Sequence, residues 1–253
     1  MTWKSLVPVR WRLLRSRLLH AARRSDAHFE EKERRDFFRR AFRALAFNGI
    51  EGDYAEFGCC GGMTFGLAHA ASRRSGRARK FWAFDSFAGL PQPASAKDAH
   101  PQWTPGEMAI SLRDFHAICR ANHISPDDYE IIEGYYERTL ADASPERADR
   151  PRSIALAYVD CDLYSSTQDV LRFLVPRLRH GMIIAFDDYF CWSADEAAGE
   201  RRAMLELCAA RPDLVLDPFL QFGWHGMSFV VQNAASLASD AAAVARLRDA
   251  AAP

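Results

Sequence analysis

The sequence predicts an α/β fold built on a mostly parallel sheet with helices on both faces. Short, continuous apolar runs alternate with segments of helical periodicity, which is typical of a parallel sheet that is buried on both faces. Several of these runs end in acidic residues or glycines, at the strand ends where open α/β sheets bind ligands. With 253 residues, 49% hydrophobic and 26% charged, the chain can bury a sizeable core as one large domain or two small ones.

The N-terminal segment differs in charge from the rest of the chain. Its first 25 residues contain seven Lys or Arg and no Asp or Glu, whereas the formal net charge of the whole chain is zero. The apolar positions of residues 7–24 fall on one helical stripe: Val7, Trp11, Leu14 and Leu18. We expect a basic arm that packs against another subunit or lies on an anionic membrane surface. A second helix is expected over residues 26–48, so residues 1–48 form the predicted N-terminal segment.

The main domain is predicted over residues 49–235, where strands and helices alternate. Strands are expected at residues 53–57, 80–84, 129–132, 154–159 and 182–186, with a late antiparallel strand at 229–231. Helices are expected at residues 64–74, 107–122 and 167–178. A long loop is expected between the second strand and the next helix, over residues 86–106. The Ala-rich residues 236–253 are expected to form a C-terminal tail.

Cysteine usage and hydropathy indicate in which cellular compartment the protein is expected. The six cysteines form no CxxC pair, which argues against a structural zinc site and against a disulfide framework. Arginines interrupt the N-terminal apolar residues, so a secretory signal is not expected. No apolar run has the length of a transmembrane helix. We therefore expect reduced thiols and a cytoplasmic protein, peripheral to the membrane if the arm binds lipid. Zero net charge gives no reason to expect nucleic acid as a partner.

The first predicted strand continues into a glycine-rich turn, EFGCCGGMT, at residues 56–64. Glycines let a backbone approach a ligand closely, and the helix that follows offers free N–H groups. Asp85 ends the second strand, where a carboxylate can accept the ribose hydroxyls of a nucleoside cofactor. A dinucleotide would prefer a full GxGxxG fingerprint, which is absent. S-adenosylmethionine needs a partner for its ammonium group, and Glu56 is the candidate.

Two later strands end in paired acids. Asp160 and Asp162 follow one apolar run, and Asp187 and Asp188 follow the next. The ends of neighbouring parallel strands meet at one edge of the sheet, so Asp160, Asp187 and Asp188 are expected to converge. Such carboxylates repel one another, and a bound cation relieves the repulsion. Ligands that are all oxygen favour Mg²⁺, Mn²⁺ or Ca²⁺ over zinc. Asp162 is the candidate base for a substrate hydroxyl.

Together these motifs resemble those of the macrocin O-methyltransferase family. The matching segments are AEFGCCGGMT (55–64), AFDSFAGLP (83–91), IIEGYYERTL (131–140), YVDCDLYSST (158–167) and IAFDDY (184–189). The resemblance implies the class I methyltransferase fold, a Rossmann-like three-layer arrangement with a mostly parallel seven-stranded sheet. It also implies methyl transfer from S-adenosylmethionine to a sugar hydroxyl. A divalent ion, usually Mg²⁺, is implied at Asp160, Asp187 and Asp188.

The resemblance also assigns individual positions. Cofactor contacts are expected at Glu56, Gly58, Cys59, Thr64, Asp85, Ser86, Gly134 and Asp160. Related catechol methyltransferases use a lysine three residues after the first metal-binding aspartate as the base, and this position is Leu163 here. The base is therefore expected to be Asp162, with His225 as the second candidate. Asp160 completes the predicted catalytic set.

Some segments depart from the antibiotic-tailoring members of the family. The long loop and residues 217–226 differ from them, so the acceptor is expected to be a sugar of an antibiotic, a surface polysaccharide or another glycoconjugate. Trp103, Trp192 and Trp224 are candidates to stack on it. One alternative is a nucleotide-dependent dehydrogenase, which the missing fingerprint disfavours. Another is a degenerate methyltransferase domain that binds a partner or a membrane, which the retained acids disfavour. A homo-oligomer with exchanged arms is also a hypothesis.

Overall fold

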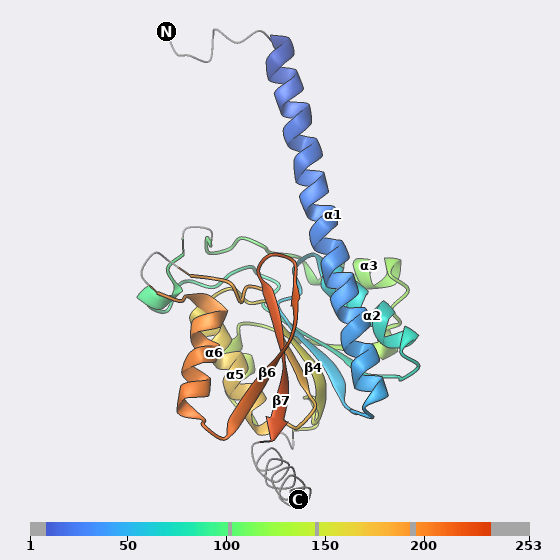
Figure 1. Ribbon diagram of the computed structural model, residues 1–253, viewed down its shortest axis with the longest axis vertical. Coiled ribbons are helices and arrows are strands. Elements are labelled where there is room, and N and C mark those ends of the chain that lie inside the picture. Colours follow the sequence, from blue (N-terminus) through green and yellow to red (C-terminus); the bar gives the residue numbers. More distant parts are fainter. Residues whose placement is uncertain (1–8, 101–102, 145–146, 193–195, 234–253) are drawn as a thin grey trace, which may run out of the picture.

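The computed structural model describes residues 9–100, 103–144, 147–192 and 196–233. Within them a seven-stranded sheet has the order β3-β2-β1-β4-β5-β7-β6 (Figure 1). Its strands are β1 (Asp53–Phe57), β2 (Phe81–Asp85), β3 (Tyr129–Glu133), β4 (Ile154–Val159), β5 (Ile183–Phe186), β6 (Leu214–Phe222) and β7 (Gly226–Asn233). The first five pair in parallel, whereas β7 is antiparallel to both β5 and β6. The predicted mostly parallel sheet is confirmed.

The helices cover both faces of this sheet. One face packs against α1 (Val9–Phe47), α2 (Met63–Arg74) and α3 (Leu112–Ala121). The other packs against α4 (Tyr136–Thr139), α5 (Tyr164–Leu174) and α6 (Gly199–Ala210). Among the described residues, four short 3-10 helices lie in the connections: Cys60–Gly62, Ala96–Asp98, Pro126–Asp128 and Val175–Arg177. The result is a three-layer arrangement with two apolar cores, one on each side of the sheet.

Two elements near the C-terminus were not expected from the sequence. Strand β6 contains Pro218, which cannot donate a ladder hydrogen bond and obscures the strand pattern. The structure tolerates it because β6 lies at the edge of the sheet and its register shifts between Pro218 and Leu220. Helix α6 begins only at Gly199, after a loop that follows the second acid pair. The predicted tail at 236–253 lies outside the described residues.

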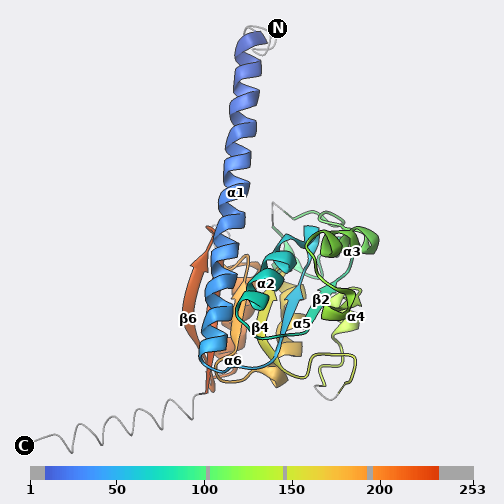
Figure 2. The same cartoon turned by 90° about the vertical axis from the view of Figure 1, so that its right-hand side faces the viewer.

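Helix α1 is continuous, where two helices were expected. Residues 9–47 contain neither Gly nor Pro, so no residue interrupts the helix. Its N-terminal half projects away from the sheet, and its C-terminal half lies against it (Figures 1 and 2). Gly49, at a φ of 68°, follows the helix, and the Ile50 N–H donates to the Leu45 carbonyl at 2.9 Å, which ends the helix in the usual way.

The C-terminal half of α1 is part of the core. The Phe37 ring stacks on Phe222 of β6 at a centroid distance of 4.4 Å, and Phe38 contacts Tyr158 of β4 at 5.1 Å. Both phenylalanines are buried. The helix therefore crosses the sheet from its edge to its centre. No helix among the described residues combines the length and the apolarity needed to cross a bilayer.

This packing predicts the cost of removing one ring of α1. Phe42 is fully buried, with ring centroids 6.0 Å from Tyr54 and 6.4 Å from Phe81. We expect Phe42→Ala to lower the free energy of unfolding by about 3–5 kcal/mol, because it leaves a cavity in the core. Phe47, on the same helix, is 89% exposed, and Phe47→Ala should change stability by less than about 0.5 kcal/mol. Denaturant unfolding checks both, and equal effects would contradict the core position of α1.

Candidate functional site

A cavity of about 370 Å³ lies at the carboxyl ends of β1, β2, β3 and β4. This volume is within the range of small-molecule sites. Five of the predicted cofactor-contacting residues line it: Gly58, Asp85, Ser86, Gly134 and Asp160. The lining also includes Asp162, residues of the loop after β2 and the first residues of α5. The predicted motifs of four separate strands are thus brought to one cavity.

Asp85 joins the glycine turn to the loop after β2. Its Oδ2 accepts the N–H of Cys59 at 2.6 Å, and its Oδ1 accepts the N–H of Phe87 at 2.7 Å. Burial raises the pKa of Asp85, while these two backbone donors favour its ionised form. A carboxylate oxygen has two lone pairs, so each oxygen keeps one for a hydroxyl in the cavity. Asp85 both forms the turn and remains available to a ligand.

Glu56 lies beneath the glycine turn and does not line the cavity. It is fully buried on the face of β1 that packs against α1 and α2. One of its oxygens accepts the Thr64 hydroxyl at 2.6 Å, and the other accepts the Tyr54 hydroxyl. Burial raises the pKa of Glu56 to about 8. Cys59 and Thr64 likewise do not line the cavity, so the cofactor contacts of these three residues stay predictions.

Position 58 requires a glycine because the backbone of another turn of the chain lies against it. Its φ is 92°, and a Cβ at this position would lie 1.7 Å from the carbonyl oxygen of Asp160. The Asp160 N–H also donates to the Phe57 carbonyl at 2.8 Å. The glycine was expected to let the backbone approach a ligand, whereas here it lets the turn after β1 contact the turn after β4. The side of the cavity formed by these turns is therefore set by backbone contact.

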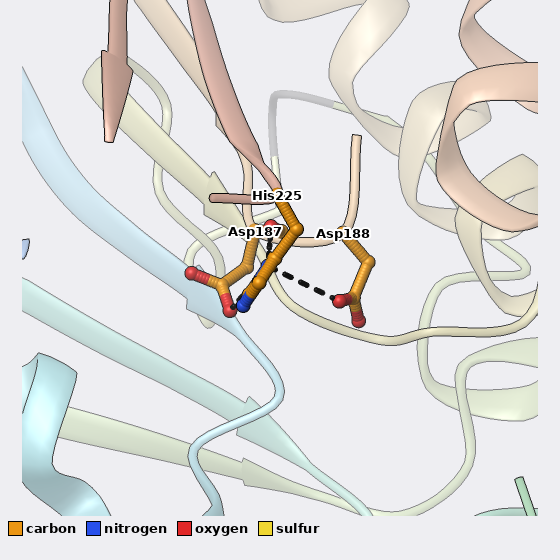
Figure 3. Close-up of side chains that lie close together, drawn as sticks. All are labelled: Asp187, Asp188 and His225. Atoms are coloured by element: carbon orange, nitrogen blue, oxygen red, sulfur yellow. Dashed lines mark hydrogen bonds and ion pairs between the residues drawn. The ribbon is translucent and has the colours of Figure 1, made fainter. Parts of the chain in front are cut away.

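The acids after β4 and β5 converge in two overlapping groups. Oxygens of Asp160, Asp162 and Asp188 lie within 4.8 Å of one another, and so do ligand atoms of Asp187, Asp188 and His225. Figure 3 shows the second group, in which His225 contacts both aspartates. The three predicted metal ligands therefore do not form one compact group. Asp188 belongs to both acid groups, whereas Asp160 belongs to the first and Asp187 to the second.

Asp187 forms a buried ion pair with Arg34 of α1. The Arg34 Nε lies 2.9 Å from Oδ1 of Asp187, and its Nη2 lies 2.6 Å from Oδ2. Tyr158 also donates to Oδ1, and Glu30 binds Arg34 from one turn earlier on α1 at 2.7 Å. Oδ1 therefore has two donors and Oδ2 has one. Asp187 keeps a single lone pair, on Oδ2, for any further ligand.

His225 comes from the turn between β6 and β7 and closes the second group (Figure 3). Its Nδ1 contacts the backbone carbonyl of Asp187 and lies 3.3 Å from Oδ1 of Asp188. Its Nε2 lies 3.3 Å from Nη2 of Arg34. A neutral ring with its proton on Nδ1 satisfies both contacts, donating to the carbonyl and accepting from Arg34. Both ring nitrogens then have partners, and the role of His225 as a base stays a prediction.

Asp162 combines strain, burial and access to the cavity. It adopts a φ of 59°, which is uncommon for a residue other than glycine, and the Leu163 N–H closes a tight turn around it by donating to Cys161 at 2.6 Å. Its side chain is buried yet lines the cavity. Burial and the neighbouring Asp188 raise the pKa of Asp162. Strained backbone and raised carboxyl pKa values are features that gather at catalytic sites.

Arg34 and Glu200 belong to the site but were missed from the sequence. Arg34 lies three residues before Phe37 and four before Phe38, so it is on the same face of α1 as these buried rings. Extending this face toward the N-terminus would have predicted that Arg34 is buried. Glu200 is fully buried and accepts the N–H groups of Cys161 and Asp188, each at 3.0 Å. No spacing in the sequence indicates this contact, because the acid follows a loop of unpredicted shape.

Comparisons with known proteins agree with this geometry. A family model described as macrocin O-methyltransferase (TylF) matches residues 27–207. The 8-demethyl-8-(2,3-dimethoxy-alpha-L-rhamnosyl)-tetracenomycin-C 4'-O-methyltransferase of Streptomyces olivaceus is 29% identical over 161 residues, 61% of this chain and 59% of that protein. The mycinamicin III 3''-O-methyltransferase of Micromonospora griseorubida is 28% identical over 165 residues, 61% and 62% of the two chains. The chain thus matches about three fifths of the length of these relatives.

A solved structure agrees on the fold. The O-methyltransferase NovP superposes with a TM-score of 0.66 at 23% identity, covering 79% of this chain and 80% of that one. The class I methyltransferase fold predicted from the sequence is confirmed. The region matched by the family model begins in α1, close to the start of its core-packing half.

The environment of Glu56 predicts a pH dependence of stability. Its pKa of about 8 in the folded protein exceeds the ordinary 4.5, and nearby Asp85 and Asp187 add to the effect of burial. Between these values the unfolded chain has released the proton that the folded chain keeps, so stability falls as pH rises. Glu56→Gln removes this contribution. The free energy of unfolding of wild type minus that of Glu56→Gln should therefore decrease from pH 5 to pH 8. A difference that stays constant in denaturant titrations across this range would contradict the prediction.

Proposed function

The chain belongs to the macrocin O-methyltransferase family, and we propose that it transfers the methyl group of S-adenosylmethionine to a sugar hydroxyl with the help of a divalent metal ion. One observation carries the proposal. The cavity at the strand ends and the first acid group share Asp160 and Asp162. A cofactor in the cavity would therefore lie beside carboxylates that can hold a cation and accept a proton.

The cavity suits a nucleoside cofactor that has no phosphates. Asp85 keeps one lone pair on each oxygen, which matches the two hydroxyls of a ribose. Ser86, Gly134 and Gly58 of the glycine turn also line the cavity. When bound, S-adenosylmethionine supplies an electrophilic methyl group on its sulfonium. The protein contributes the orientation of that group toward the acceptor.

The acid groups suit a hard divalent cation. Asp160, Asp162 and Asp188 offer oxygen atoms within 4.8 Å of one another, and Asp187 has one free lone pair beside them. The guanidinium of Arg34 binds Asp187, and the negative charges of Asp187 and Glu30 already balance its positive charge. The remaining carboxylates favour Mg²⁺ or Mn²⁺, since oxygen ligands suit such ions. When bound, the ion supplies positive charge that lowers the pKa of an acceptor hydroxyl.

We assign proton removal to Asp162. Its carboxyl lines the cavity, so an acceptor hydroxyl between cofactor and cation would lie within its reach. A carboxylate at this position could take the proton that an acceptor hydroxyl releases. Asp160, from the same turn, contributes charge toward the cation. His225 remains the second candidate, although both of its ring nitrogens already have partners.

The acceptor class rests on the relatives and on exposed tryptophans. The names of both relatives describe O-methylation, of a rhamnosyl-tetracenomycin compound in one and of mycinamicin III in the other. Trp192 and Trp224 are exposed on segments that border the acid groups, and exposed rings of this kind suit stacking on a sugar. A sugar hydroxyl of an antibiotic, a surface polysaccharide or another glycoconjugate is the acceptor that we propose.

Calorimetric titration of S-adenosylmethionine tests the cofactor and the metal separately. S-adenosylmethionine is titrated into the protein twice, once in the presence of Mg²⁺ and once in the presence of a chelator. We expect binding in both conditions, because Asp85 and the glycine turn belong to neither acid group. Methyl transfer to a panel of rhamnosides should require the metal. An absence of binding in both conditions would overturn the proposed cofactor.

Substitution of the assigned base predicts a selective loss of turnover. Asp162→Asn should lower kcat by about 10²–10⁴-fold, the usual contribution of a general base, and leave the affinity for S-adenosylmethionine within a few-fold of wild type. Asp213→Asn removes an exposed aspartate that pairs only with Arg211 among the described contacts, and should leave kcat unchanged. Steady-state methyl transfer at saturating Mg²⁺ measures both variants. Full activity in Asp162→Asn would assign the base elsewhere.

A further inference from the structure

We propose that Glu200 is a positioning residue, which fixes the two acid-bearing loops at the spacing that the cation requires. The inference rests on the proposed function and concerns a residue that no sequence motif indicated. Glu200 is the second residue of α6 and is fully buried. It does not line the cavity, so it acts through other residues and not on the substrate.

The carboxylate of Glu200 bridges two loops that are far apart in the sequence. Its Oε1 accepts the N–H of Cys161 at 3.0 Å, and its Oε2 accepts the N–H of Asp188 at 3.0 Å. Cys161 lies between Asp160 and Asp162, and Asp188 is itself in both acid groups. A single side chain thus links the loop after β4 to the loop after β5, beyond the pairing of the two strands.

The start of α6 is fitted closely to the first of these loops. Gly199 has a φ of 49°, and a Cβ there would lie 2.6 Å from the carbonyl oxygen of Asp162 and 2.8 Å from the ring of Trp103. A side chain at position 199 would therefore push the helix away from the turn. Glycine allows α6 to come close enough for the next residue, Glu200, to reach both N–H groups.

The N–H groups of Cys161 and Asp188 explain why a carboxylate, that of Glu200, is needed beside the other carboxylates. Burying another anion beside Asp160, Asp162 and Asp188 is unfavourable unless hydrogen bonds compensate it. Glu200 accepts two backbone donors and lies in the first turn of a helix, where the helix dipole favours negative charge. A glutamine could accept from only one donor, because its NH₂ group would face the other N–H. Only a symmetrical acceptor of this length satisfies both loops.

The test compares metal binding and local protection in five full-length proteins: the wild type, two Glu200 variants, one control variant and Asp188→Asn. Glu200→Gln removes one acceptor, and Glu200→Asp keeps the charge but is too short to reach both donors. Glu206→Gln is the matched control, since Glu206 is on the same helix but binds Lys97, Arg202 and Tyr164 outside the acid groups. Mn²⁺ affinity is measured by electron paramagnetic resonance, and the exchange of the Cys161 and Asp188 amide protons by NMR without metal.

We expect both Glu200 variants to bind Mn²⁺ about 10–100-fold more weakly, the usual effect of losing a residue that orients metal ligands. Their Cys161 or Asp188 amides should exchange faster, while affinity for S-adenosylmethionine stays within a few-fold. Glu206→Gln should match wild type in every measurement. The aspartate variant separates geometry from charge, because a purely electrostatic role would leave it like wild type.

Asp188→Asn makes the two possible failures distinguishable. If the wild type binds no Mn²⁺, or binds it as tightly as Asp188→Asn does, the metal centre of the proposed function is overturned, and the positioning role with it. If Asp188→Asn weakens binding but both Glu200 variants bind like wild type and keep their amides protected, only the role of Glu200 is overturned.

Discussion

The repulsion among five carboxylates at one edge of the sheet is the constraint on which the rest of the site depends. Asp160, Asp162, Asp187, Asp188 and Glu200 lie at or beside the ends of β4 and β5. Each is stabilised differently: Asp187 by a guanidinium, Glu200 by two backbone N–H groups. The other three keep oxygen atoms close together, and among the described contacts only Asp188 has a basic side chain beside it, His225. This unequal distribution of partners supports the divalent ion that we propose at the site.

Helix α1 connects this constraint to the folding of the whole domain. The helix that fills one core with Phe37 and Phe38 also carries Arg34 to Asp187, one turn earlier on the same face. A single helix therefore both packs the core and compensates the charge of Asp187. The family model begins to match within this helix, at residue 27.

The sequence was informative wherever structure is local and uninformative wherever it is long-range. The five parallel strands could be predicted because continuous apolar runs identify them, and the acids could be placed because parallel strand ends share an edge. The alternation of side chains along β1 could have shown that Glu56 faces the helices and not the cavity, but only once the buried face was known. The partner of Asp187 could not be predicted, since Arg34 lies 153 residues away and is one of many arginines in its segment. Pro218 concealed β6 for a local reason, because proline is expected to interrupt a strand.

The continuity of α1 restricts how this protein can vary in evolution. Each residue of an α-helix turns the chain by about 100°, so one inserted or deleted residue rotates everything before it. A change of length between Arg34 and Phe38 would separate the guanidinium from Asp187 while the rings stayed in the core. Insertions and deletions are therefore excluded from this turn. A change of length in the half of the helix that projects from the sheet would leave the pairing of Arg34 with Asp187 intact.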